Sequence, residues 1–576
     1  MFRIPINNRN KRLETKTTGG RSVNKRFLIA SGMTLACYFV FLFFSPLYDS
    51  SDSMMAAIVT DRLFGENTLS QFQHPILCIF IGLLSRIFPS ADLFSVTVHV
   101  MVGAGIFCVV YFGLQSISDI PIRSWNLENY ALVLILLLSV FFLSAGVNIW
   151  NCNYTITAGA LVFMGFFLLS LREKRSGGCV AGTVLVTCGF MLRRESGMLF
   201  LPFVGLELLF SFMEKTDRKA DILRRYLPCL LVIALLLGSR EVLYSIEPYK
   251  TASRYNAART AIMDFPMKSA DTVADIVNPI DYAAALDWTF ADTEVMDADL
   301  LERIATAGEK NKYSLDRTGF LSVLREMRHT LFHTNLYMLL LVIITVLLLL
   351  RNLLCCGGVW RTESLLTVAG ASLILMYFTF RGRAPMRVWE PVLFAADMTL
   401  IQAACSKKAS KKNPSREITN TVFLILLAVI LWFSAGQVMA HAKKNETVHT
   451  ALTARVNIDD KEYEASFDSL FIWPNWHGTV PRFFEEKETL PSQRVIDHNI
   501  ALGDWTYGQP YFTEFLKRIG AENPFQLLLE GKAYIMGNGA EKYLQLHYGE
   551  DIRLVATEIV IDGRTAYRVE RSSTDD

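Results

Sequence analysis

The chain has 576 residues, of which 52% are hydrophobic and only 19% are charged. Soluble domains usually contain about 25% charged residues, and the mean hydropathy here is +0.29. This composition excludes a disordered chain, a collagen-like chain and a small disulfide scaffold, and it argues against an ordinary soluble enzyme. The formal net charge of +2 argues against a nucleic-acid partner, because nucleic-acid binders present a basic face.

The N-terminal residues 1–26 are basic and polar, and the first apolar run, Leu28–Pro46, is long enough to cross a bilayer as a helix. Ten further apolar runs follow: Leu93–Leu114, Tyr130–Ala145, Tyr154–Leu171, Cys179–Leu192, Met198–Phe212, Leu227–Leu237, Leu331–Leu350, Leu365–Phe380, Val388–Ala404 and Ile418–Met439. The sequence therefore predicts a multi-span α-helical membrane protein with about eleven transmembrane helices between residues 27 and 440.

The distribution of lysine and arginine predicts the orientation of these helices. The basic segments are residues 1–26, Arg172–Arg175, Lys215–Arg225, Arg351 with Arg361, and Lys407–Arg416. With eleven spans, all of them are cytoplasmic and the C-terminus lies outside the cell membrane. The stretch His74–Phe88 then does not cross the bilayer, and its length of about 15 residues favours an interfacial or re-entrant helix.

Three segments are expected on the outer side: Leu47–Asp92, Ser239–Thr330 and the tail His441–Asp576. The second is polar with scattered aromatic residues, and we expect it to be helical. The tail alternates polar and apolar residues, and Asp562-Gly563 between two alternating runs predicts a β-hairpin. We therefore expect residues 441–576 to form a small extracytoplasmic α/β domain.

Two carboxylates, Asp49 and Asp52, stand where the first span leaves the bilayer, and an amphipathic helix ending near Gly65 is predicted after them. Either carboxylate could simply cap this helix, because an acidic group is favourable at a helix N-terminus. The functional alternative is a general base that deprotonates an acceptor hydroxyl or amine, or a ligand for a divalent cation.

Two short turns on the expected outer side contain five arginines, against the usual excess of positive charge on the cytoplasmic side. They are Arg193-Arg194-Glu195 after the fifth span, and Arg381, Arg383 and Arg387 between the ninth and tenth spans. A single arginine at this depth can place its charge at the membrane surface with no functional role. Guanidinium groups also bind phosphate in a bidentate manner. The cluster therefore suggests a site for a phosphate leaving group beside a general base.

These features resemble the GT-C superfamily of membrane glycosyltransferases, in the style of bacterial aminoarabinose transferases and protein O-mannosyltransferases. The matching residues are Asp49 and Asp52, Leu63-Phe64-Gly65, His74-Pro75-Ile76-Leu77, Phe88-Pro89 and Arg193-Arg194-Glu195. In the family, the corresponding stretches are an acidic motif, a helix ending in glycine, a Lys-Pro-Pro-Leu-like helix start, a short apolar helix and an arginine motif. The resemblance covers roughly the first 240 residues, and the arginine turn at 381–387 is a further point of similarity.

The resemblance implies an inverting transfer from a polyprenyl-phosphate sugar to a glycan or glycolipid acceptor at the outer surface of the cell membrane. Asp52 is favoured over Asp49 as the base, because it directly precedes the predicted helix. The residues implied to bind the donor phosphate or other parts of the substrates are Arg193, Arg194, Glu195, Arg381, Arg383, Arg387 and His74. His74 also suits a purely structural role at a helix start.

The chain departs from the family pattern in two places. Asp49 and Asp52 stand three positions apart, where the family usually has adjacent acidic residues, and the linker Val147–Asn153 has no carboxylate at the family's second acidic position. We therefore expect a reaction that needs no metal, with a divalent cation as the alternative. A lipid-linked polysaccharide polymerase or ligase and a transporter or flippase are the competing functions.

Several other polar or aromatic residues have two interpretations. Glu207 and Asp397 lie inside apolar runs, where acidic groups are commonly functional but can also pair with a neighbouring group. Trp473, Trp476 and Trp505 in the tail could stack on sugars or form the core of the small domain.

Overall fold

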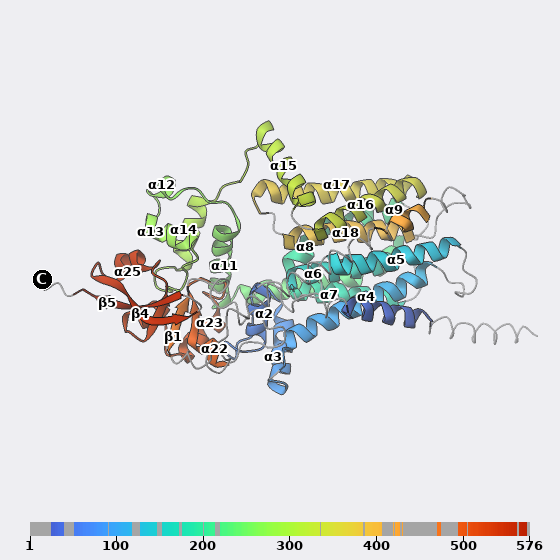
Figure 1. Ribbon diagram of the computed structural model, residues 1–576. Helices are drawn as coiled ribbons and strands as arrows, with labels where there is room; N and C mark the ends of the chain where they lie inside the picture. Colours follow the sequence, from blue (N-terminus) through green and yellow to red (C-terminus); the bar gives the residue numbers. More distant parts are fainter. Residues whose placement is uncertain are drawn as a thin grey trace, which may run out of the picture.

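The structure, a computed structural model, is mostly helical. It describes residues 25–39, 51–89, 91–117, 127–146, 153–171, 176–199, 201–213, 219–333, 336–356, 358–383, 386–405, 419, 421–426, 429, 469–473, 493–503, 505–561 and 564–572; some side chains within these ranges, including those of 51–54, are not described. A long helical bundle lies beside a smaller assembly of helices and strands (Figure 1).

The bundle is built from apolar helices that follow one another through the chain. After a helix at 25–39, they are α4 (Leu93–Ile117), α5 (Leu127–Gly146), α6 (Tyr154–Ser170), α7 (Ser176–Leu192), α8 (Arg194–Leu199), α9 (Leu201–Met213), α10 (Lys219–Tyr244), α16 (Leu336–Cys355), α17 (Gly358–Arg381) and α18 (Met386–Cys405). Within the described residues, five segments are long and apolar enough to cross a membrane: Leu93–Ile117, Arg194–Met213, Lys219–Tyr244, Met338–Cys355 and Gly358–Arg381.

These helices confirm the prediction of a multi-span helical membrane protein, whereas the number of eleven spans stays a prediction. The predicted span Leu331–Leu350 does not coincide with one helix of the structure. Its first residues end α15 (Arg317–His333), and α16 starts at Leu336. Arginine and histidine in the last turns of α15 keep that helix polar, which is why the apolar run is divided between two helices.

Glycine allows α6 and α7 to approach each other closely. Every residue of α6 from Tyr154 to Ser170 is buried, and a Cβ atom added at Gly165 would lie 2.6 Å from the carbonyl oxygen of Gly182. Close backbone contact through small residues is a common way for membrane helices to associate. This packing fixes the start of α6 beside the end of α7, where Arg193 stands.

The second outer segment forms α11 (Tyr249–Asp264), α12 (Ala270–Val273), α13 (Pro279–Leu286), α14 (Ala298–Gly308) and α15. The C-terminal part has helices α22 (Gln493–His498), α23 (Pro510–Arg518), α24 (Pro524–Leu529) and α25 (Glu541–Tyr548), and strands β1 (Leu470–Trp473), β2 (Asn499–Ala501), β3 (Ala533–Met536), β4 (Ile552–Ile561) and β5 (Arg564–Arg571).

The five strands form one mixed sheet in the order β2-β1-β3-β5-β4. Strands β2, β1 and β3 are parallel, whereas β5 pairs antiparallel with both β3 and β4. Ile561 of β4 pairs with Arg564 of β5, so the hairpin predicted at Asp562-Gly563 is confirmed. The small C-terminal sheet is confirmed as well.

One hydrophobic core, named the outer core because its three segments are those expected on the outer side, joins parts that are distant in the sequence. It contains Met55, Ile58 and Val59 of α2 (Ser51–Thr60), most of α11–α14, and the inner residues of the C-terminal part. Phe64 packs on the rings of Tyr511 (6.1 Å) and Phe515 (5.1 Å). All three segments therefore lie together at one end of the bundle (Figure 1).

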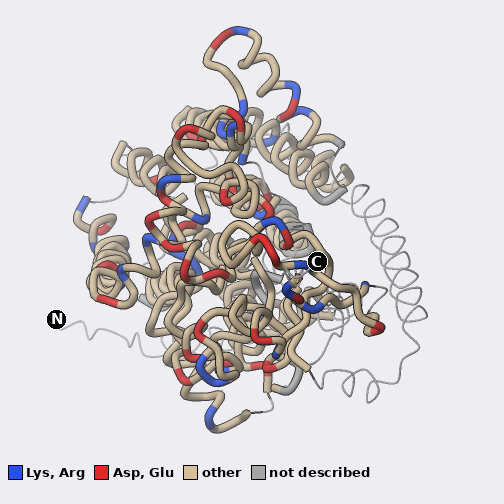
Figure 2. The backbone as a smooth tube through the Cα atoms, turned by 90° about the vertical axis from the view of Figure 1, so that its left-hand side faces the viewer, with Lys and Arg blue, Asp and Glu red and all other residues tan. Residues whose placement is uncertain are grey.

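A fully buried carboxylate adds polar contacts to this core. Asp292 accepts hydrogen bonds from Asn523 (2.9 Å), Tyr543 (3.0 Å) and Tyr548 (2.8 Å). Acidic and basic residues are otherwise interspersed over this end of the molecule (Figure 2).

The helix expected to end near Gly65 differs from its prediction. Helix α2 ends at Thr60, and Arg62 adopts a left-handed backbone with φ of 71° that a helix cannot contain. Residues Met55–Thr60 are all buried, because α2 packs on α3 and α4 on one side and in the outer core on the other. It is thus not a surface amphipathic helix.

Helix α3 (Pro75–Ile87) projects sideways from the bundle (Figure 1). Leu77, Ile81 and Gly82 on one face are buried, whereas Ile76, Ile79, Phe80, Leu83 and Ile87 on the other are exposed. A short helix with an exposed apolar face is typical of a membrane interface.

Candidate functional site

The ends of several bundle helices meet at the outer core. Arg240, near the end of α10, donates a hydrogen bond to the carbonyl oxygen of Gln71, and Arg381, at the end of α17, donates one to Asn311 Oδ1 (2.6 Å). Because α10 rises about 1.5 Å per residue, its basic start at Lys219 lies roughly 30 Å away, at the opposite end of the bundle. The two arginine turns therefore occupy the same end.

Arg193 is held by the bundle itself. Its Nη1 atom donates to Thr155 Oγ1 (2.6 Å), and its Nε atom lies 3.8 Å from Glu195 Oε2. The guanidinium group also lies over the rings of Phe72 (5.3 Å) and Tyr154 (5.2 Å). With only 12% of the side chain exposed, this cation has a fixed position.

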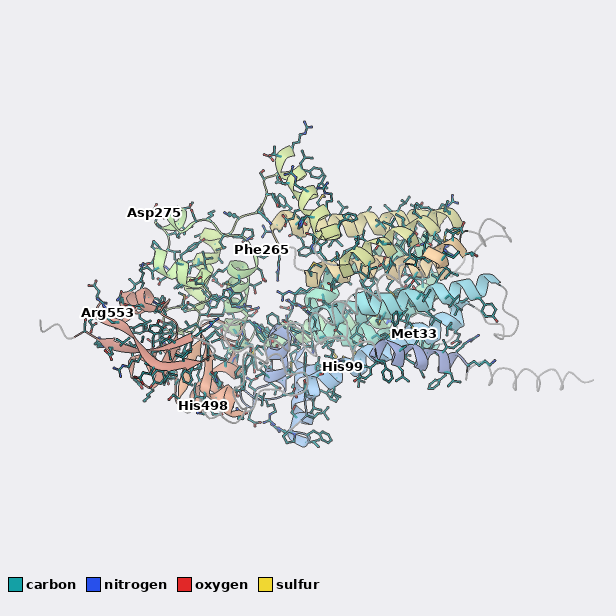
Figure 3. The ribbon with its side chains drawn as sticks, in the orientation of Figure 1. Met33, His99, Phe265, Asp275, His498 and Arg553 are labelled. Carbon is teal, nitrogen blue, oxygen red and sulfur yellow. The ribbon has the colours of Figure 1, made fainter. Side chains whose placement is uncertain are left out.

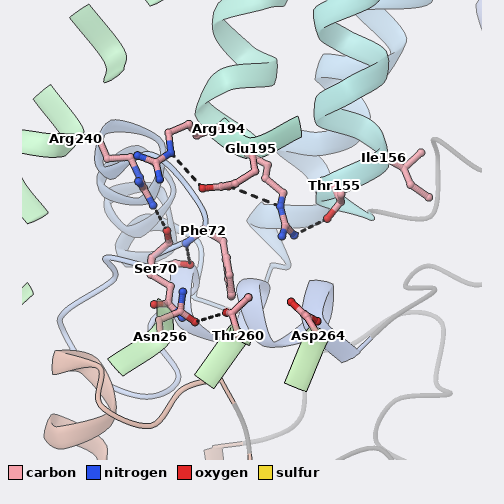
Figure 4. Close-up of polar contacts among 12 residues, drawn as sticks. Ser70, Phe72, Thr155, Ile156, Arg194, Glu195, Arg240, Asn256, Thr260 and Asp264 are labelled. Carbon is pink, nitrogen blue, oxygen red and sulfur yellow. Dashed lines mark hydrogen bonds and ion pairs between the residues drawn. The ribbon is translucent and has the colours of Figure 1, made fainter. Parts of the chain in front are cut away.

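Arg194 and Glu195 extend this network towards α10 (Figure 4). Arg194 Nε donates to Glu195 Oε1 (3.2 Å), and its Nη1 atom pairs with Glu241. Arg240 Nη1 also lies 3.9 Å from Glu241 Oε1. About half of the Glu195 side chain (48%) is exposed, so its carboxylate stands at the open side of the network.

The second turn is bound to the outer helices instead. Arg383 Nη2 lies 2.5 Å from Asp264 Oδ2 at the end of α11, and Arg381 pairs with Glu309 after α14. Both guanidinium groups lie over the ring of Phe265, at 4.8 Å for Arg381 and 5.4 Å for Arg383. Phe265 itself lies between the outer helices and the bundle (Figure 3).

The two turns are close enough to influence each other's charge. Burial lowers the pKa of the Arg383 guanidinium; Asp264 and Glu195 oppose this effect, whereas the positive charges of Arg193 and Arg387 add to it. Residues from the fifth and ninth predicted spans therefore share one electrostatic environment. Ordinary arginines remain protonated even so.

The charged residues named at this end include more basic than acidic side chains. The basic residues are Arg193, Arg194, Arg240, Arg381, Arg383 and Arg387, and the acidic residues are Glu195, Glu241, Asp264 and Glu309. This set has two more positive than negative charges, and it combines guanidinium groups with aromatic surfaces. Such a site is suited to an anion with more than one negative charge.

His74 has a bracing role in the structure. Its Nδ1 atom accepts a hydrogen bond from the backbone N–H of Ile76 (3.2 Å) and so caps α3. The proton is therefore on Nε2, which donates to the carbonyl oxygen of Leu236 (3.1 Å). Its backbone N–H donates to Met191 (2.7 Å), two residues before Arg193. Burial lowers the pKa of His74, which favours this neutral form.

The structure describes little of the two candidate bases, Asp49 and Asp52. Asp49 lies outside the described residues, and for Asp52 only the backbone is described, in the first turn of α2. Asp61 follows α2 and was not singled out from the sequence. It accepts hydrogen bonds from Ser85 Oγ (2.7 Å) and from the backbone N–H of Phe94 (3.3 Å). Burial raises its pKa to about 7.

Sequence reasoning missed the partners of the arginines: Phe72, Arg240, Glu241 and Asp264. A weak signal existed for Arg240-Glu241, a charged pair at the end of an apolar run. No local pattern marks Phe72 or Asp264, because their contacts with Arg193 and Arg383 connect distant parts of the chain.

The two acids inside apolar runs contact neutral polar groups. Glu207 Oε1 accepts hydrogen bonds from Tyr226 (2.8 Å) and Gln402 (2.9 Å), and it lines a small cavity with phenylalanine side chains of α6 and α9. Asp397 Oδ1 accepts one from Thr345 (2.7 Å). These contacts tie α9, α10, α16 and α18 together.

The tail aromatics that the structure describes favour core packing. Trp473 is buried and donates from Nε1 to Asn499 (2.6 Å). Trp505 is buried against Phe72, with ring centroids 4.8 Å apart. Trp476 lies outside the described residues. Through Trp505, the C-terminal part nevertheless touches the loop under Arg193.

A comparison of the chain with protein-family models, curated proteins and solved structures finds no match. Within the described ranges, no group of three or more histidine, cysteine, aspartate or glutamate side chains is placed to hold a metal ion. The arginine cluster is therefore the feature of this chain that bears most directly on its function.

Proposed function

We propose that this chain is a glycosyltransferase of the GT-C kind in the cell membrane. It takes a sugar from a polyprenyl phosphate at the outer surface and transfers it to a glycan or glycolipid. The proposal includes an N-terminus in the cytoplasm and a C-terminal domain outside, with the arginine site at the outer end of the bundle.

The observation that carries this proposal is the meeting of the two arginine turns. Arg193 and Arg383 are 190 positions apart, yet both stand at the end of the bundle that meets the outer core, Arg193 over Phe72 and Arg383 beside Asp264. A polyprenyl-phosphate sugar is a phosphodiester with one negative charge, whereas the departing lipid monophosphate acquires a second. A site rich in guanidinium groups favours the leaving group over the donor, and such differential binding lowers a reaction barrier.

In the proposed reaction, Asp52 accepts the proton of the acceptor hydroxyl. The acceptor oxygen forms a bond to the anomeric carbon while the bond from that carbon to the phosphate oxygen breaks. The bonding electrons leave with the lipid phosphate, which the arginines bind. Attack opposite the leaving group inverts the anomeric configuration.

The first test is transfer of radiolabelled sugar from a polyprenyl phosphate to an envelope glycolipid extract by the purified protein in lipid nanodiscs. We expect Asp52→Asn to abolish transfer, because general-base catalysis contributes about 10²–10⁴-fold. Asp49→Asn is expected to keep most activity. Asp275→Asn, on an exposed outer loop (Figure 3), is the matched control for loss of one carboxylate.

Transfer by Asp52→Asn at the wild-type rate would remove the assignment of the base. Movement of intact donor across the bilayer, with no cleavage of the sugar–phosphate bond, would favour a flippase instead. Since no second carboxylate stands in Val147–Asn153, activity is expected to change less than about twofold with a chelator of divalent cations.

A further inference from the structure

A buried glutamine in the loop next to the first arginine turn has no hydrogen-bond partner among the residues that the structure describes. Gln73 is completely buried, and neither its Nε2 nor its Oε1 atom has a partner among the described residues. A carboxamide has two donors and two acceptor positions, and buried polar groups are nearly always paired. Its burial without partners is costly, and therefore needs a physical reason.

Both neighbours of Gln73 touch the helix ends that hold the arginines. Phe72 lies under the guanidinium of Arg193, and the backbone N–H of His74 donates to Met191 near the end of α7 (2.7 Å). The His74 ring also lies 3.3 Å from Ser239 Oγ, one residue before Arg240. Gln73 therefore stands in the middle of a loop that contacts the helix ends carrying Arg193 and Arg240.

The same loop contains a second buried glutamine, Gln71, whose side chain does have hydrogen-bond partners. Gln71 is also buried, but its Nε2 atom donates to the carbonyl oxygen of Trp505 (3.3 Å) and its Oε1 atom accepts from Gln509 (3.0 Å). Thus Gln71 fastens the loop to the C-terminal part. Gln73 makes no comparable contact, although it is only two positions away.

We propose that Gln73 is a ligand-binding residue whose carboxamide hydrogen-bonds the hydroxyl groups of the donor sugar, next to the phosphate held by the arginines. This inference rests on the proposed function. A sugar hydroxyl is both donor and acceptor, so one carboxamide can bind two neighbouring hydroxyls at once. A site built in this way discriminates strongly against a ligand that lacks those hydroxyls.

The experiment compares thermal unfolding of the full-length protein in detergent for wild type, Gln73→Leu and Gln71→Leu. Leucine has a similar size but no polar atoms. Without ligand, we expect Gln73→Leu to raise the Tm by about 1–2 °C, because it removes unpaired buried groups. Gln71→Leu is expected to lower the Tm, because it removes the hydrogen bonds of Gln71 with Trp505 and Gln509.

The ligand arms use farnesyl phosphate alone and farnesyl phosphates that carry glucose, mannose, galactose or arabinose. We expect farnesyl phosphate alone to shift the Tm of the wild type and of Gln73→Leu by the same amount. For the wild type, we expect an additional shift with at least one of the farnesyl phosphates that carry a sugar. Gln73→Leu is expected to lose only that additional shift.

Three outcomes would overturn the assignment in distinguishable ways. A lower Tm for unliganded Gln73→Leu would show that its carboxamide is already satisfied, for example by buried water. An additional sugar shift that survives in Gln73→Leu would mean that other residues bind the sugar. If wild-type protein responds to none of these lipids, the proposed function fails together with the role of Gln73.

Discussion

The two arginine turns are similar in sequence position and charge, but they are held by different parts of the molecule. Arg193 contacts Thr155 and Tyr154 of α6 and Phe72 of the first outer loop. Arg383 and Arg381 pair with Asp264 and Glu309 of the second outer segment. The first turn is thus part of the bundle's end, whereas the second connects the bundle to the helices that cover it.

In the proposed reaction, this difference gives the two turns separate roles around one phosphate. Arg193 contacts a hydroxyl and two rings, and its one carboxylate neighbour among the contacts described, Glu195, lies at 3.8 Å. More of its charge is therefore available to a ligand than that of an arginine in a close ion pair. A cation paired with a carboxylate has most of its charge neutralised, and an arriving phosphate must compete with that carboxylate. We therefore expect the first turn to dominate catalysis and the second to link donor binding to the outer segment.

The strongest challenge to this comparison is Arg193→Ala. We expect sugar transfer to fall about 10²–10³-fold, as is typical when one group that stabilises transition-state charge is lost. Arg193→Lys should rescue little, because lysine cannot stack on Phe72 and Tyr154 while binding phosphate in a bidentate manner. The measurement is kcat/KM for the lipid donor.

The matched control for Arg193 is Arg254→Ala. Arg254 is another paired arginine, bound to Asp299 (2.7 Å) and Glu302 (2.8 Å) on the exposed side of α11. It should keep wild-type transfer. An equal loss in Arg254→Ala and Arg193→Ala would mean that the effect reflects general damage to the outer segment.

A smaller effect is expected at the second turn. Arg383→Ala should lower transfer by about tenfold and also lower the Tm, because it leaves the three-quarters buried Asp264 carboxylate unpaired. Asp264→Ala combined with Arg383→Ala should be less harmful than the sum of both. A double-mutant cycle should give a coupling of about 1 kcal/mol; strict additivity would show that the pair does not link the segments.

Lowering the pH is expected to destabilise the contacts around the first arginine turn before those around the second, because His74 becomes protonated. Because burial lowers the folded-state pKa of His74 below 6.5, the unfolded chain binds its proton more readily than the folded chain. Its contribution to stability is therefore full above pH 6.5 and is lost as the pH falls below that value. We expect the Tm to decrease by a few degrees in this range.

His74→Asn sharpens this test, since asparagine keeps the cap of α3 but does not titrate. Its Tm should depend less on pH between 5 and 7 than that of the wild type. An unchanged pH dependence in His74→Asn would mean that another group causes it. Asp61 would act in the opposite direction, because its raised pKa makes the folded chain bind that proton more readily than the unfolded chain.

The smallest effect is expected for Arg381→Ala. A quarter of its side chain is exposed, and its partner Glu309 is 38% exposed, so the ion pair contributes about 0.5 kcal/mol or less. Transfer should fall less than about threefold, measured in the same assay. A loss as large as that of Arg193→Ala would reverse the order of the two turns.

Much of the fold could be predicted because its signals are local. The apolar runs between Leu93 and Ala404 mark the bundle helices, and Asp562-Gly563 marks the hairpin between β4 and β5. The arginine turns were found for the same reason, since their charges interrupt apolar runs. Each of these patterns can be read within about twenty residues.

The remaining features depend on tertiary contacts that leave no local pattern. Helix α2 looks amphipathic in sequence, but both of its faces are covered, one by α3 and α4 and the other by the outer core. The pairing of Arg383 with Asp264 likewise joins residues more than a hundred positions apart. Only coordinates reveal such contacts.

The shared outer core has a consequence for the order in which the protein is made. Arg518 donates a hydrogen bond to the carbonyl oxygen of Phe64, 454 residues earlier in the chain (3.0 Å). At a synthesis rate of about 5–20 residues per second, the first half of this contact leaves the ribosome roughly 25 to 90 seconds before the second. Until then, Phe64 lacks the rings of Tyr511 and Phe515 that cover it in the folded protein, so a nascent chain that stops before its last hundred residues leaves this apolar side chain without those contacts.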